Sequence, residues 1–176
     1  MSRVIEEKFS GLLYLEGSSF EDERGTISKP LWNAIIPDFR VDESYFTVSK
    51  KDVIRGMHVQ VSPFQQGKFL YVSRGKILDV VVDLRKTSET FGQHTSYILT
   101  GEDHRGLYVP PGLAHGYLTL EEGSSIHYVQ SGKYSREHEA GIHYDSFGYQ
   151  WPVKNPILSG KDSGLPTLSD YQRAIL

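Results

Sequence analysis

Short runs of alternating apolar and polar residues fill most of the chain between residues 45 and 130. Such alternation predicts β-strands, because successive side chains of a strand point to opposite faces of its sheet. Turns rich in glycine, proline or charge separate the runs, and helical periodicity is almost absent. This pattern predicts an all-β sandwich or barrel. The expected strands cover residues 8–16, 45–48, 53–60, 68–72, 76–84, 92–99, 106–109, 116–120 and 125–130.

Residues 76–84 form the most apolar of these runs. Alternate positions of a strand share one face of the sheet, and we expect this face to lie in the core. Its side chains are Leu78, Val80, Val82 and Leu84.

The remaining segments have weaker patterns. Residues 17–19 are polar, and residues 20–25 are expected to form a turn with Arg24 at its tip. Residues 32–39 favour a helical turn that ends at their proline. Only the tail, residues 169–176, favours a helix, so helices are expected to be short and peripheral.

A length of 176 residues suits one domain with a real hydrophobic core. No repeat, linker or low-complexity tract interrupts the chain. We therefore expect a single domain over residues 1–176, with a core at about 20–162 and a tail at 163–176. A net charge of −3 and the lack of a Lys/Arg cluster give no reason to expect binding to nucleic acid.

The absence of cysteine excludes disulfides and thiolate metal ligands, and it fits a reducing compartment. The first eight residues are charged and lack the apolar stretch of a signal peptide, and no apolar run approaches the length of a membrane span. We therefore expect a soluble cytoplasmic protein with no membrane partner.

Reactive polar residues interrupt two of the predicted strands. His58 and Gln60 share one face of the strand at 53–60, and Lys68 shares a face with Leu70 and Val72. A lysine on a face that should be buried is costly unless it has a function. A solvated edge for Lys68 and a hydrogen-bonded core position for His58 are the alternatives. Together the residues favour a polar pocket lined from a sheet.

A second informative segment runs from Pro110 to Gly116, where a Pro-Gly turn leads to His115 at the head of a strand. It resembles the second motif of the cupin fold, a jelly roll or double-stranded β-helix. The first cupin motif normally supplies His-x-His and a later Glu to a metal, whereas this chain has His58, Gln60 and Lys68. Because an amide is a weak ligand and an ammonium repels a dication, we expect a cavity without metal or other cofactor.

These residue types suit proton abstraction next to a carbonyl group. His58 can remove a moderately acidic C–H proton, and Lys68 can stabilise the enolate oxygen. Tyr128 can return a proton from another direction, and Asp162 can orient and polarise the histidine. Removal and return on opposite faces is epimerisation. The alternatives are that Tyr128 is a core tyrosine and that Asp162 is a turn residue.

The order and spacing of six motifs are similar to those of one known family. The motifs are Arg55-Gly56-Met57-His58-Val59-Gln60, Gln66-Gly67-Lys68, residues 79–85, Pro110-Pro111-Gly112-Leu113-Ala114-His115-Gly116-Tyr117, Trp151-Pro152 and Leu158-Ser159-Gly160-Lys161-Asp162. Over about residues 20–162 the chain resembles the dTDP-4-dehydrorhamnose 3,5-epimerase family. The resemblance implies epimerisation at C3, C5 or both of a nucleotide-linked 4-keto-6-deoxyhexose, for deoxysugar and surface-polysaccharide synthesis.

The resemblance also implies roles for individual residues. It makes His58 the base, Asp162 its partner, Lys68 the enolate stabiliser and Tyr128 the acid. The residues that it places around the substrate are Arg24 and Arg55 at the diphosphate, His115 and Gln60 in the cavity, and Tyr134 near the sugar. The family is usually dimeric, with an N-terminal segment of one subunit completing the site of its neighbour.

The chain departs from the family pattern where the resemblance places the nucleotide. Residues 26–29, including Lys29, replace an aromatic and an acidic residue, and Glu43 and Tyr45 replace a glutamine and an asparagine. Tyr45 could supply the missing aromatic platform, Glu43 could accept hydrogen bonds from guanine or cytosine, and Lys29 could bind a carbonyl or phosphate oxygen. A changed base and simple drift within a thymidine-specific enzyme both remain open.

Other functional classes also remain. A metal-dependent cupin dioxygenase or sugar isomerase conflicts with Gln60 and Lys68, and metal analysis would detect it. A non-catalytic sugar-binding cupin would not need His58, Lys68, Tyr128 and Asp162 together. A 3-epimerase or a ketoisomerase acting on a GDP- or CDP-linked keto-sugar is closer and would differ in which carbons exchange deuterium.

Overall fold

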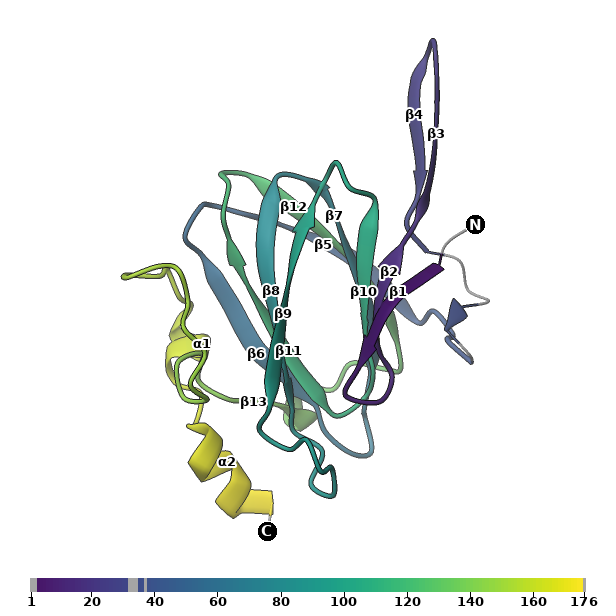
Figure 1. Ribbon diagram of the computed structural model, residues 1–176. Coiled ribbons are helices and arrows are strands. Elements are labelled where there is room, and N and C mark those ends of the chain that lie inside the picture. The colour runs from purple at the N-terminus through teal and green to yellow at the C-terminus, as the bar shows by residue number, and fades with distance from the viewer. Residues whose placement is uncertain (1–2, 32–34, 37, 176) are drawn as a thin grey trace.

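The computed structural model describes residues 3–31, 35–36 and 38–175 and shows two antiparallel sheets packed face to face (Figure 1). One sheet has the strand order β1-β2-β10-β7-β12-β5 and the other β13-β6-β11-β8-β9, while β3 and β4 form a separate hairpin. The strands are β1 (Arg3–Lys8), β2 (Leu12–Glu16), β3 (Ser18–Asp22), β4 (Gly25–Lys29), β5 (Glu43–Ser49), β6 (Ile54–Gln60), β7 (Gly67–Arg74), β8 (Lys76–Asp83), β9 (His94–Thr100), β10 (Arg105–Val109), β11 (Leu113–Thr119), β12 (Ser124–Ser131) and β13 (Glu139–Gly141). The short helices are η2 (Arg136–His138), α1 (Gly160–Ser163) and α2 (Leu168–Ile175).

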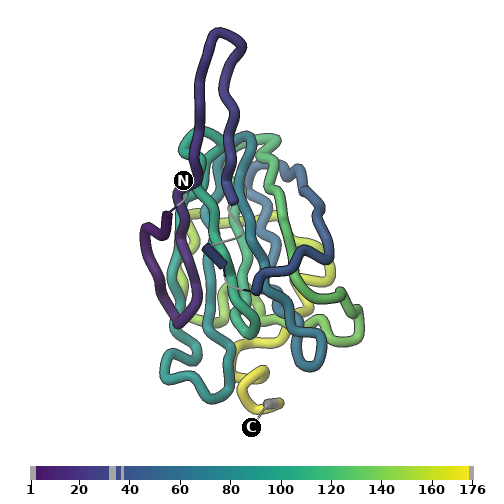
Figure 2. Tube along the Cα trace, turned by 90° about the vertical axis from the view of Figure 1, so that its right-hand side faces the viewer, coloured from purple at the N-terminus to yellow at the C-terminus, as the bar shows by residue number. Residues whose placement is uncertain are grey.

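This arrangement confirms the predicted all-β fold of cupin type with short peripheral helices. Figure 1 shows α1 and α2 beside the sheet that contains β6. Both views show the β3–β4 hairpin projecting well beyond the body of the sandwich (Figure 2).

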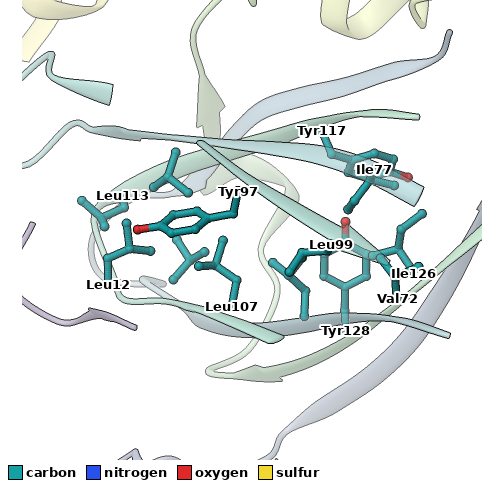
Figure 3. Packing of buried hydrophobic residues seen from close by; sticks show 13 residues of the cluster. Leu12, Val72, Ile77, Tyr97, Leu99, Leu107, Leu113, Tyr117, Ile126 and Tyr128 are labelled. Atoms are coloured by element: carbon teal, nitrogen blue, oxygen red, sulfur yellow. The ribbon is translucent and has the colours of Figure 1, made fainter. Parts of the chain in front are cut away.

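The space between the two sheets holds one apolar cluster, built from both layers (Figure 3). Its members include Leu12, Leu70, Ile77, Leu99 and Tyr128. A second apolar cluster lies on the outer face of the β6-containing sheet. There the C-terminal segment, including Ile142 and Phe147, packs on the sheet. Strand β8 is therefore buried on both faces. The predicted core face of Leu78, Val80, Val82 and Leu84 is confirmed, and it belongs to the second cluster.

The N-terminal predictions were only partly right. Residues 8–16 were expected as one strand, but β1 ends at Lys8 and β2 starts at Leu12. The turn between them has positive φ at Phe9, Ser10 and Gly11, and the chain reverses there. Residues 17–25 were expected as a polar segment and a turn, but they belong mostly to the β3–β4 hairpin, which keeps Arg24 at its tip. The residues of this hairpin are mostly exposed, so burial imposed no alternating pattern on them.

The predicted strands between residues 43 and 131 are confirmed, with small shifts at their ends. The helical tail is confirmed as α2, while α1 and β13 were not predicted. The prediction for residues 32–39 falls partly on residues 32–34 and 37, which lie outside the described residues. Within the described part of the chain, no helix is long and apolar enough to cross a membrane.

Candidate active site

A cavity opens between the two sheets and has two adjoining compartments that share Tyr45, His58 and Lys68. The outer compartment, of about 280 Å³, is lined by these three and by Glu43, Val59, Gln60, Gln66, Gln130, Tyr134 and Glu139. The inner compartment, of about 160 Å³, adds Thr47, Arg55, His115, Tyr117 and Tyr128 to the shared three. The structure thus brings most of the predicted site residues to one place.

His58 and Asp162 form a direct pair although they lie far apart in the sequence. His58 Nε2 is 2.6 Å from Asp162 Oδ1. Asp162 lies in helix α1, which presents this carboxylate. The backbone N–H of Asp162 donates to the hydroxyl of Ser159, the N-cap residue of the helix. The second carboxylate oxygen accepts from the Gly56 amide at 3.4 Å. If Nε2–H donates to the aspartate, Nδ1 is left as the basic nitrogen of His58.

The charge state of Asp162 follows from these contacts. Burial by itself would raise its pKa, but the hydrogen bond and charge of His58, together with the Gly56 amide, hold the pKa below its usual value. The carboxylate is therefore ionised near neutral pH and stabilises a protonated His58. The alternative that Asp162 is only a turn residue is wrong, since its side chain is buried against His58.

Lys68 reaches the cavity from β7, in the sheet opposite His58. Burial lowers its pKa to about 8, while the charge of Glu139 acts in the opposite direction. The ammonium form still predominates at neutral pH but titrates much earlier than a surface lysine. The predicted polar pocket with an inward-facing lysine is thus confirmed by the geometry.

Tyr128 lies on β12 and belongs both to the apolar cluster and to the wall of the inner compartment. Figure 3 shows its hydroxyl directed toward the opposite sheet. Burial raises its pKa well above the ordinary value, and the neighbouring Tyr117 and Tyr45 act in the same direction. Tyr128 therefore keeps its proton across the physiological pH range. The two interpretations of this residue, core tyrosine and cavity residue, both hold.

A second histidine–aspartate pair lies beside the first one. His115 is the cross-strand partner of His58 between β11 and β6, and a Cβ on Gly56 would come within 2.4 Å of the Gly116 Cα, so these strands need glycine to approach so closely. His115 Nδ1 lies 3.3 Å from Asp79 Oδ2. Burial raises the pKa of Asp79 and lowers that of His115, so both groups are pushed toward their neutral forms. Asp79 was not predicted as a site residue.

The predicted substrate-binding residues divide into two groups. Six of them line the cavity, namely Arg55 and His115 in the inner compartment, Glu43, Gln60 and Tyr134 in the outer one, and Tyr45 in both. Arg55 Nε donates to the Ser49 hydroxyl at 3.1 Å. The Tyr134 hydroxyl donates to Glu139 Oε2 at 2.9 Å.

Arg24 and Lys29 line neither compartment of their own chain. Both lie on the projecting hairpin, where Arg24 pairs with Asp22 at 2.6 Å and its side chain is 80% exposed. The Lys29 ammonium lies 5.9 Å from the centre of the Phe20 ring. A single chain therefore does not bring these two residues to the cavity.

Sequence reasoning missed Glu139 and Lys161. Glu139 lines the outer compartment, and Lys161 Nζ pairs with it at 2.5 Å. The position of Lys161 next to Asp162 was a usable signal, whereas Glu139 lies on the very short β13 and carried none. Among the described residues, no three His, Cys, Asp or Glu side chains gather in a way that could hold a metal ion.

The fold and site define a jelly-roll protein of cupin type whose cavity is lined by His58 and His115 from one sheet and by Lys68 and Tyr128 from the other. A sequence profile described as dTDP-4-dehydrorhamnose 3,5-epimerase matches residues 6–170. The chain therefore belongs to the dTDP-4-dehydrorhamnose 3,5-epimerase family, as its motifs predict.

Individual relatives agree with this assignment. The dTDP-4-dehydrorhamnose 3,5-epimerase of Shigella flexneri is 36% identical over 166 residues, which cover 90% of this chain and 92% of the relative. The enzyme of the same name from Bacillus anthracis, solved with TDP and PPi bound, superposes with a TM-score of 0.91 at 36% identity and covers 95% of this chain and 99% of that one. A 3,5-epimerase from Legionella pneumophila in complex with dTDP-4-keto-L-rhamnose has a TM-score of 0.92 at 32% identity, with 100% and 97% coverage.

Proposed function

We propose that this protein is a cofactor-independent epimerase that inverts C3 and C5 of a dTDP-linked 4-keto-6-deoxyhexose in deoxysugar biosynthesis. One observation carries the proposal. His58, held by Asp162, and Tyr128 reach the same cavity from opposite sheets, with Lys68 beside them. A base and an acid on opposite walls are what inversion of a carbon centre requires.

The proposed reaction begins with proton removal. The 4-keto group makes the C–H bonds at both C3 and C5 acidic, because each carbon is adjacent to the carbonyl. His58 Nδ1 takes the proton, the electron pair of the C–H bond moves into the enolate, and negative charge collects on O4. The Lys68 ammonium stabilises that oxygen, while the Asp162 carboxylate stabilises the imidazolium.

Proton return completes the inversion. Tyr128 donates its phenolic proton to the enolate carbon from the face opposite His58, and the new C–H bond uses the enolate electron pair. The raised pKa of Tyr128 keeps its proton in place until the enolate forms. Because one ketone activates both neighbouring carbons, the same set of groups serves C3 and C5 in turn.

The nucleotide is proposed to be dTDP. Support comes from the relatives solved with TDP and with dTDP-4-keto-L-rhamnose. In this chain Arg55 offers a cation to the diphosphate, and Glu43, Tyr45, Gln60 and Tyr134 surround the outer compartment. No observation favours GDP or CDP, a metal-dependent reaction or non-catalytic sugar binding.

A homodimer is proposed because Arg24 does not line the cavity of its own chain. The hairpin that carries Arg24 also exposes apolar side chains, with Phe20 61% and Ile27 56% accessible. Exposed apolar side chains on a projecting arm are typical of a contact surface. In the proposed dimer the hairpin packs on the partner subunit and brings Arg24 and Lys29 to the mouth of the partner's cavity. A single domain over residues 1–176 and a cytoplasmic location are part of the same proposal, and the lack of cysteine supports the latter.

The deciding experiment is incubation with dTDP-4-keto-6-deoxyglucose in D₂O, with deuterium and configuration read at each carbon by NMR. We expect uptake and inversion at both C3 and C5. The CDP- and GDP-linked sugars are run in parallel to test the base, and purified His58→Asn protein serves as the control for contaminating enzyme. Uptake at C3 alone would identify a 3-epimerase, and no uptake from any of the three sugars would reject the epimerase function.

A further inference from the structure

Tyr45 makes a direct contact with the proposed proton donor. It lies on β5 directly opposite Tyr128 on β12 in the antiparallel register. The two rings are 4.8 Å apart between centroids and inclined by only 14°, which is a stacked arrangement. Stacked aromatic pairs of this kind stabilise a specific relative position of the two rings.

The ring of Tyr45 is held at its far end as well. The Gln130 amide, which is almost fully buried, donates to the Tyr45 hydroxyl at 2.7 Å. Gln130 is two residues beyond Tyr128 on the same strand, so both contacts of Tyr45 lead to β12. The side chain is thereby fixed across the strand pair instead of swinging free in the cavity mouth.

Tyr45 also stands at the boundary between the two compartments. It is one of the three residues that line both, and 37% of it is accessible, while only 4% of Tyr128 is. The outer ring therefore covers the inner one. Burial raises the pKa of Tyr45 to about 12, so the covering ring stays uncharged during the reaction.

From this geometry we propose that Tyr45 is a positioning residue for Tyr128, which fixes the phenol so that it delivers its proton to the face of the sugar opposite His58. The inference rests on the proposed function and adds a residue to it. The proton step itself is unchanged. The Tyr128 O–H bond breaks, a C–H bond forms with the enolate electron pair, and the phenolate afterwards regains a proton from the solvent. A displaced phenol returns the proton less well, because proton transfer depends on close and aligned groups.

The test separates proton removal from proton return. In D₂O, deuterated carbons that keep their configuration report removal by His58 without delivery by Tyr128. Deuterated carbons that have inverted report the complete step. For Tyr45→Ala we expect the ratio of inverted to retained deuterated product to fall about tenfold or more. For Tyr45→Phe, which keeps the stacked ring, we expect that ratio to stay within about twofold of wild type whatever the overall rate.

A double mutant decides whether Tyr45 acts through Tyr128. In the Tyr128→Phe background there is no phenol to position, so adding Tyr45→Ala should lower the ratio no further. An equal further fall in that background would overturn the proposal, since Tyr45 would then act independently. A Tyr45→Ala protein with the wild-type ratio would overturn it as well.

Folding and substrate binding have their own readouts. Circular dichroism and the melting temperature show whether Tyr45→Ala folds. If it does not, Tyr45→Leu, which fills the space without an aromatic ring to stack, takes its place and should lower the same ratio, whereas an unchanged ratio would reject the proposal. If Tyr45 served only to bind the substrate, Tyr45→Ala would raise KM and would slow proton removal and proton return equally. Failure of the wild-type protein to take up deuterium would reject the proposed function, whereas wild-type inversion with an unaffected Tyr45→Ala ratio would reject only this inference.

Discussion

The inner compartment and the β3–β4 hairpin differ in how their polar side chains are held. In the inner compartment, His58, His115 and Tyr128 each contact another site residue, and most of these side chains are buried. On the hairpin, Arg24 pairs with Asp22, two residues away, and the strands are mostly exposed. Proton transfer needs fixed geometry, and the folded chain provides it. The hairpin contacts the body of its own chain at Ser28, whose hydroxyl lies 3.0 Å from His104 Nδ1, while its tip at Arg24 is exposed.

The inner compartment holds the groups proposed for proton transfer, whereas the hairpin holds residues proposed for substrate binding. Desolvation in the inner compartment shifts the pKa values of Lys68, Asp79, His115 and Tyr128. Such shifts are typical of catalytic sites, because low polarity strengthens electrostatic interactions. Charges in water interact weakly, so the exposed Arg24 can contribute substantial binding free energy only when a partner or a substrate covers it.

The largest effect is expected from His58→Asn, which removes the proposed base and leaves a side chain of similar size. Deuterium uptake at both carbons should fall by about 10²- to 10⁴-fold or more. Asp162→Asn is the matched variant for the other half of the pair, and it should also slow uptake because the imidazolium loses its counter-charge. Both are checked by NMR in D₂O, with unchanged melting temperatures as the folding control. Near wild-type uptake by His58→Asn would show that the inner compartment holds a different base.

The next effect concerns Arg24, the hairpin residue. On the proposal that Arg24 contacts the diphosphate, Arg24→Ala removes a charge-assisted contact and should raise KM by about 10- to 100-fold. If the hairpin serves the partner's site, mixing Arg24→Ala with His58→Asn chains should recover about a quarter of wild-type activity, because half of the dimers are hybrids with one intact site.

Two outcomes would contradict this arrangement of the hairpin. A protein that is monomeric at all concentrations in light scattering would exclude sharing between subunits. Arg24→Ala with normal KM would show that the hairpin does not bind the substrate at all. Each variant assayed alone, at the same total concentration, is the control for the mixing experiment.

A pH profile tests the burial of Lys68. Its pKa is lowered to about 8, so the ammonium is lost as the pH rises through that value and enolate stabilisation is lost with it. We expect kcat/KM to fall about tenfold per pH unit above that point. The pKa of Tyr128 is raised well above its ordinary value, so its ionisation belongs to a higher pH. Lys68→Arg, which stays charged, should lack this alkaline limb even if it is slower. Persistence of the limb in Lys68→Arg would assign it to another group.

The smallest expected effect concerns the nucleotide at the outer compartment. In competitive binding to the free protein, dTDP should be preferred over UDP, CDP and GDP by at least about tenfold, or ~1.4 kcal/mol. Glu43→Gln is the matched variant, since it keeps the shape of a residue that lines the mouth and removes its charge. A preference for GDP or CDP that disappears in Glu43→Gln would show instead that the base specificity has changed.

Local sequence determined much of the fold. Alternation predicted the strands between residues 43 and 131, because burial of one face of a sheet imposes a period of two on the side chains. It failed at the exposed β3–β4 hairpin, where no face is buried, and at α1, whose four residues are too few to show helical periodicity. The chemistry-bearing residues His58 and Lys68 stood out for the opposite reason, because each interrupted an apolar pattern.

Only the tertiary structure decided which of these residues meet. His58 and Asp162 are 104 positions apart in the sequence. Their contact depends on the short helix α1, capped by Ser159, which no local sequence pattern predicted. The stacking of Tyr45 on Tyr128 follows from the register of β5 against β12, and the approach of Asp79 to His115 from β8 lying beside β11. Sequence patterns report burial, which each residue experiences separately, whereas strand register and the closure of two sheets are properties of the whole chain.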